Sequence, residues 1–184
     1  MVAPSKFAHV VYDTHRYEEM IEWYQFVFDA RIGHKGEVLA FLTYDDEHHR
    51  FAFRNLGDAP DPTDGPKDRD ASGVNHVAYT WNDLDELLDQ YSKLKERGIL
   101  PVRPIRHGMT LSMYYQDPDG NMMEFQIDLC DPQTAYDFME SEAFANNPIG
   151  ELFDPDELLE KYRADENITS LLFRSDQPDF ITAD

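Results

Sequence analysis

The chain has 184 residues, 41% of them hydrophobic and 13% aromatic, which is typical of a globular protein with one domain or two small fused modules. Its 37 acidic and 16 basic residues give a formal net charge of −21, which argues against nucleic acid or an anionic membrane as a partner. No apolar run approaches the roughly 18 residues of a membrane span, and the first residues do not resemble a signal peptide. A single cysteine, Cys130, excludes an intrachain disulfide, so we expect a cytoplasmic protein.

Two short segments carry the same pattern around a histidine. Lys6–Thr14 and Gly73–Trp81 both read apolar-x-His-Val-x-Tyr, with His9 and His76 at equivalent positions. Apolar and β-branched residues on both sides of each histidine predict a strand. The sequence therefore predicts an internal repeat.

The segments that follow the two histidines support the repeat. Apolar residues recur at helical spacing over residues 16–29 and again over residues 83–97, where Gly98 ends the helix. Each predicted helix is followed by three short strand-like runs, and Asp117–Asn121 predicts a tight turn between the last two. These runs cover residues 31–33, 38–44 and 50–55 in the first half, and residues 102–106, 111–116 and 122–127 in the second.

These elements predict an α+β fold made of two modules with the order strand-helix-strand-strand-strand, or βαβββ. The boundaries that we expect are residues 5–56 for the first module, 57–72 for a linker, 73–128 for the second module and 131–184 for a C-terminal extension. The extension is predicted to hold helices over residues 134–145 and 154–163 and to be otherwise extended or loosely ordered. We expect it to pack over a module or to contribute to a dimer contact, as an accessory element with no catalytic role.

Three residues of the repeat have the side chains of a metal site. His9 and His76 occupy equivalent strands, which converge if the two halves pair into one curved sheet. Glu124 lies in the last strand between apolar neighbours, where an inward-facing carboxylate would be costly without a cation. Two histidines and one carboxylate are typical of non-haem Fe(II) oxygenases. Mn(II) suits the same ligands, so the metal is expected to be Fe(II), with Mn(II) as the alternative.

Alignment of the last strands of the two halves places Ala52 opposite Glu124. The first half therefore supplies no second carboxylate, and we expect three protein ligands with open coordination positions. An open coordination sphere is typical of a reactive metal rather than a structural one. His15 and His34 have no equivalent in the other half and are expected at the surface.

Over residues 5–128 the chain resembles the vicinal oxygen chelate superfamily (glyoxalase/bleomycin resistance/dioxygenase), and within it the type I extradiol ring-cleaving catechol dioxygenases. The most specific stretches are His107-Gly108-Met109-Thr110 and the Asp-Pro-Asp-Gly-Asn turn before Glu124. The resemblance implies that His9, His76 and Glu124 bind the metal.

The resemblance also assigns three acid-base or substrate-contacting residues. Tyr114 stands ten residues before Glu124, as in that family, whereas Tyr115 would point to the opposite face of the strand. His107 precedes it in the His-Gly-x-Thr segment, at a spacing slightly shorter than in the larger two-domain members. His49, next to His48 in a polar turn, matches the further acid-base histidine of the first module.

This resemblance implies cleavage of a small aromatic diol by dioxygen, beside rather than between its hydroxyls, with neither nucleic acid nor membrane as a partner. His49 would stabilise the reduced oxygen and act as an acid, while His107 and Tyr114 would bond the substrate oxygens and assist proton transfer. We expect a homo-oligomer, a dimer or higher.

Two other functions fit the same fold. A glyoxalase-like isomerase or lyase would use two carboxylates, and Ala52 speaks against it. A protein that binds a flat aromatic ligand without chemistry would have no need of the metal-binding residues, which this chain keeps. The sequence does not select one aromatic substrate.

Overall fold

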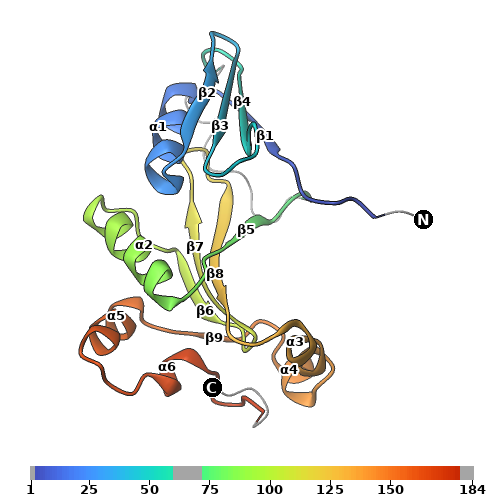
Figure 1. Cartoon of the computed structure of the whole chain (residues 1–184), viewed down its shortest axis with the longest axis vertical. Coiled ribbons are helices and arrows are strands. Elements are labelled where there is room, and N and C mark those ends of the chain that lie inside the picture. Colours follow the sequence, from blue (N-terminus) through green and yellow to red (C-terminus); the bar gives the residue numbers. More distant parts are fainter. Residues whose placement is uncertain (1–2, 60–71, 179–184) are drawn as a thin grey trace. The chain divides into compact units, whose positions relative to one another are not determined.

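The computed structural model describes residues 3–59 and 72–178 (Figure 1). The chain forms two compact units. The first contains the described residues up to Gly73 together with the turn Asp117–Asn121, and the second contains Val74–Gln116 and the described residues from Met122 onward. Each unit is built on one β-sheet. The linker expected over residues 57–72 falls largely on residues outside the described ranges.

The sheet of the first unit has the strand order β1-β4-β3-β2. β1 runs parallel to β4, and the other neighbours are antiparallel. The helix α1 packs against β3 and β4 (Figure 1). The elements are β1 (Val10–Thr14), α1 (Tyr17–Phe28), β2 (Arg31–Lys35), β3 (Leu39–Thr43) and β4 (Phe51–Asn55).

The second unit repeats this order and adds a fifth strand from the extension, giving β5-β8-β7-β6-β9. β5 is parallel to β8, as β1 is to β4. The module therefore has the expected βαβββ order twice, and the predicted α+β fold class is confirmed. The elements are β5 (His76–Thr80), α2 (Leu84–Glu96), β6 (Arg103–Arg106), β7 (Thr110–Gln116), β8 (Met122–Asp128) and β9 (Glu151–Leu152).

The two module helices form where an apolar stripe meets a cap. In α1 the buried residues Met20, Ile21, Tyr24 and Val27 recur at helical spacing and face the sheet core. In α2 the Asp83 carboxylate accepts a hydrogen bond from the backbone N–H of Glu86, which satisfies one free donor of the first turn. Over the described ranges, no helix combines the length and apolar character needed to cross a membrane.

The extension is more finely divided than the sequence predicted. The single helix expected over residues 134–145 is wrong, because α3 ends at Met139 and the Ser141 hydroxyl caps a new helix by accepting from the Phe144 N–H. A short helix also lies in the part expected to be loosely ordered. The elements are α3 (Pro132–Met139), α4 (Glu142–Asn146), α5 (Pro155–Arg163) and α6 (Thr169–Leu172).

Asp117 organises the turn that belongs to the first unit. Its carboxylate is 5% exposed and accepts from the Tyr24 hydroxyl at 3.1 Å, the Asp119 N–H at 3.0 Å, the Asn121 N–H at 2.8 Å and the Asn121 side-chain amide at 2.7 Å. Burial raises the pKa of this carboxyl, and the hydrogen bonds partly oppose that shift.

Asp117→Ala should lower the free energy of unfolding by about 2–4 kcal/mol, because it leaves several buried donors without an acceptor. Urea unfolding followed by circular dichroism measures this loss. Asp46→Ala removes an exposed turn carboxylate of the same unit and is the matched control. Equal effects of the two substitutions would contradict the proposed role of the Asp117 hydrogen bonds.

Candidate metal and acid-base site

The second unit brings His76 and Glu124 together. β5 pairs with β8 in parallel, with Ala78 opposite Glu124. Side chains two residues apart on a strand point to the same face, so His76 and Ala78 share a face of β5. Because Ala78 lies opposite Glu124, the side chains of His76 and Glu124 project from the same face of the sheet. The His76 Nε2 lies 3.0 Å from the Glu124 Oε2. Two of the three predicted metal ligands are thus adjacent.

Tyr114 and His107 complete this group. Tyr114 pairs directly with Glu124 across β7 and β8 and therefore shares its face. Its hydroxyl lies 3.1 Å from the His107 Nε2, which is itself 3.6 Å from the Glu124 Oε1. Tyr115 points the other way, is 1% exposed and donates to the Met113 sulfur at 3.6 Å in the core. The preference for Tyr114 over Tyr115, which rested on its spacing to Glu124, agrees with this placement.

Glu124 is 6% exposed, and its ion-pairing neighbours within 4.0 Å among the described residues are two histidines rather than a lysine or arginine. A buried carboxylate without a permanent cation is costly. The imidazole of His76 beside it adds a nitrogen donor. This donor set fits a divalent metal that accepts mixed nitrogen and oxygen ligands, such as Fe(II) or Mn(II).

The environment sets the proton states of the two predicted acid-base residues in this unit. Burial lowers the pKa of His107, although the nearby Glu124 carboxylate opposes the shift, so the ring is neutral near pH 7. Burial and Glu124 together raise the pKa of Tyr114, so its hydroxyl keeps its proton. The pair therefore offers a neutral imidazole and a hydroxyl donor on one face.

The first unit holds the other two predicted site residues. His9 precedes β1 and His49 precedes β4, and the pairing of Val10 with Phe51 brings their rings to 4.4 Å between centroids. The His48 Nδ1 lies 2.5 Å from the His49 Nδ1. Burial, with smaller contributions from His9 and His48, lowers the pKa of His49, which favours its neutral form.

The strand pairing gives the two units the same alignment as the sequence repeat. Val11 lies opposite Ala52 in the first unit, as Ala78 lies opposite Glu124 in the second. Ala52 is 2% exposed and supplies no ligand. Within the described parts of the chain, no three His, Cys, Asp or Glu side chains form a metal-binding group. The ligand set of His9, His76 and Glu124 therefore stays a prediction.

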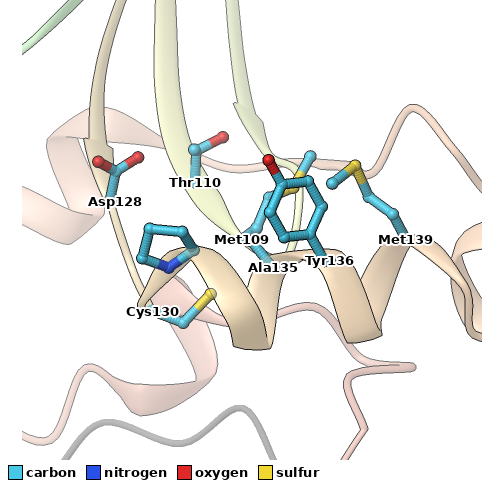
Figure 2. Close-up of a pocket in the computed structure, with 8 residues that line it drawn as sticks. Met109, Thr110, Asp128, Cys130, Ala135, Tyr136 and Met139 are labelled. Atoms are coloured by element: carbon cyan, nitrogen blue, oxygen red, sulfur yellow. The ribbon is translucent and has the colours of Figure 1, made fainter.

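A hollow of about 260 Å³ lies against α3 in the second unit (Figure 2). Thr110 and Asp128 line it and are opposite each other at one end of β7 and β8. They stand four residues along the strands from Tyr114 and Glu124, roughly 14 Å away, so the hollow is separate from the histidine-carboxylate group. The other lining residues are Met109, Cys130, Pro132, Ala135, Tyr136 and Met139.

A family model described as the glyoxalase/bleomycin resistance protein/dioxygenase superfamily matches residues 6–125. The chain belongs to this superfamily. Its membership confirms the resemblance expected from the repeat and from the turn before Glu124.

Two relatives in this superfamily come from Rhodococcus globerulus. Biphenyl-2,3-diol 1,2-dioxygenase 2 is 48% identical over 156 residues, which cover 84% of this chain and 80% of the relative. Biphenyl-2,3-diol 1,2-dioxygenase 3 is 38% identical over 167 residues, which cover 89% of this chain and 85% of the relative. The alignments thus extend well beyond a single module.

The fold is also similar to that of a solved glyoxylase/bleomycin resistance protein/dioxygenase domain from Frankia sp. EAN1pec. The TM-score is 0.56 at 15% sequence identity, over 68% of this chain and 99% of that one. At this identity the similarity concerns the fold alone.

One contact of the site residue His107 was not predicted from the sequence. The His107 Nδ1 lies 2.6 Å from the Ile149 main-chain carbonyl oxygen, which comes from the C-terminal extension. A contact made by a main-chain carbonyl does not depend on residue type, so no sequence motif marks it. The only signal in the sequence was the Asn-Asn-Pro-Ile-Gly run, which indicates an ordered turn.

Proposed function

We propose that the chain is an extradiol dioxygenase, which cleaves a small aromatic diol with dioxygen beside its two hydroxyls. The observation that carries this proposal is the grouping of His76, Glu124, His107 and Tyr114 on one sheet face. The names of the two Rhodococcus relatives support the same chemistry. They favour it over a glyoxalase-like isomerase or a non-catalytic aromatic-binding protein.

The metal of this enzyme is proposed to be Fe(II), with Mn(II) as the alternative, held by His9, His76 and Glu124. Two neutral imidazoles and one carboxylate would leave a site charge near +1, which a diol bound as a monoanion neutralises. When bound, the metal would supply neighbouring positions for the diol and dioxygen and so remove the entropic cost of bringing three reactants together.

His107 and Tyr114 are proposed to manage the protons of the diol. The neutral His107 ring can accept a proton from a diol hydroxyl at Nε2, the nitrogen that faces Tyr114 and Glu124. Tyr114, which keeps its own proton, can donate a hydrogen bond to a substrate oxygen on the same face. The half-buried His49 is proposed to stabilise the reduced oxygen by donating a hydrogen bond from its neutral ring, and to act as an acid later in the reaction.

The high acidic charge supports a small-molecule substrate rather than nucleic acid or an anionic membrane. A cytoplasmic location and a homo-oligomeric state remain predictions from the sequence. The aromatic diol itself is proposed only as a class.

Elemental analysis of protein purified without oxygen, paired with oxygen uptake on a panel of catechols, tests the function. We expect near-stoichiometric iron and consumption of one dioxygen per diol, with a yellow ring-opened product. Bound metal without oxygen uptake on any diol would move the function toward an isomerase. A protein that binds no metal and takes none up on titration would contradict both the metal site and the dioxygenase proposal.

A further inference from the structure

The His107 ring is held from both of its nitrogens. Its Nδ1 lies 2.6 Å from the Ile149 carbonyl oxygen, and its Nε2 lies 3.1 Å from the Tyr114 hydroxyl. A carbonyl oxygen only accepts, so Nδ1 must carry the proton of the neutral ring. The lone pair of the ring is then on Nε2, directed at Tyr114 and Glu124. The Ile149 carbonyl thus selects the tautomer that can accept a substrate proton.

The backbone around Ile149 is fixed by Asn147 and Gly150. The Asn147 side chain donates to the Gly150 carbonyl and accepts from the Gly150 N–H, both at 3.0 Å. Gly150 has φ +102°, and a Cβ there would overlap the Arg106 carbonyl and lie 3.0 Å from the His107 Cα. Only glycine allows this close approach of the extension to the backbone of His107.

Arg174 forms hydrogen bonds to both of these backbone segments, one at His107 and one at Asn147. Its side chain is 0% exposed, and its guanidinium donates to the His107 carbonyl at 3.2 Å and to the Asn147 carbonyl at 2.8 Å. Asp176 pairs with it at 2.6 Å. A buried arginine is stable only when its donors are satisfied, so these carbonyls must stay where they are.

We infer that the segment Asn147–Gly150 of the C-terminal extension, clamped by Arg174, is a positioning element that sets the orientation and tautomer of His107. The extension is therefore part of the machinery rather than an accessory. Asn147, Gly150 and Arg174 act through His107 and touch no reacting atom. The catalytic consequence rests on the proposed function, whereas the tautomer does not.

Gly150→Ala tests the inference, with Gly98→Ala as the matched control. Both glycines have a positive φ, but a Cβ at Gly98 meets nothing within 4 Å. Long-range ¹⁵N–¹H NMR of the full chain loaded with diamagnetic Zn(II) reports which nitrogen of His107 holds the proton. We expect Nδ1 protonation in the parent and in Gly98→Ala, and loss of that preference in Gly150→Ala. A proton on Nε2 in the parent would overturn the inference.

Steady-state kinetics on the iron-loaded enzyme give the second measurement. Gly150→Ala should lower kcat roughly 10- to 100-fold with KM for the diol changed less than about threefold. In a His107→Ala background the same substitution should change kcat less than about twofold, because its target is gone. If Gly150→Ala lowers kcat as much in the His107→Ala background as in the parent, the inference is wrong.

Asn147→Ala provides a second variant in case Gly150→Ala does not fold. It removes the two bonds to Gly150 without adding a side-chain atom and should move the NMR and kinetic readouts in the same direction. A parental tautomer and parental kcat in this variant would overturn the role of the segment. If the parent consumes no oxygen with any diol, the proposed function fails, and the NMR result still decides the positioning.

Discussion

Replacing Glu124 with glutamine should remove the bound metal and lower oxygen uptake with a diol by at least about a thousandfold. The change keeps the shape of the side chain but removes the charge and the strong oxygen donor. The residue is 6% exposed, so neither water nor salt replaces the lost carboxylate. Elemental analysis and oxygen-electrode assays on the purified variant measure both effects.

The same substitution has a separate consequence for stability. Without metal, the Glu124 carboxylate is buried against two histidines, and its burial is costly. The metal-free Glu124→Gln protein should therefore unfold at a urea concentration at least as high as the metal-free parent. Only the parent should gain stability on adding Fe(II), because a ligand that binds the folded state alone stabilises it.

Asp89→Asn is the control for this experiment, since it removes one negative charge from the same unit at a side chain that is 84% exposed. It should retain iron, activity and the stabilisation by metal. A Glu124→Gln protein that holds iron and turns over like the Asp89 variant would exclude Glu124 as a ligand.

The placement of His76, Tyr114 and Glu124 on one sheet face could be predicted once the strands were assigned, because side chains alternate along a β-strand. A period of two places Tyr114 and not Tyr115 beside Glu124, and the repeat fixes His76 on the neighbouring parallel strand. These relations need only the strand assignments and the turn at Asp117.

The contribution of the extension could not be predicted, because its contacts have no local pattern. Nothing in the sequence around Arg174 indicates burial, since arginine is usually exposed, yet its side chain is fully buried. Its burial depends on carbonyls from His107 and Asn147, which are far apart in the chain. Likewise, Ser141 divides a helix because a cap competes locally with helix continuation.

His9→Ala should lose the metal and the oxygen uptake as completely as Glu124→Gln, although His9 belongs to the other unit. The reason lies in the repeat, since His9 occupies the position in the first module that His76 occupies in the second. Metal content and turnover of the variant measure the effect. His34→Ala removes an exposed histidine from the same unit and should change neither quantity.

His49→Ala separates a ligand from an acid-base residue within the first unit. Its ring lies 4.4 Å from that of His9 between centroids, so the two substitutions disturb the same surface. His49→Ala should keep its iron and lose turnover, roughly 10²- to 10⁴-fold, as expected for a general acid. If His9→Ala instead keeps its metal and its activity, the first unit donates no ligand. His107, with Nε2 3.6 Å from Glu124, would then be the candidate for the third.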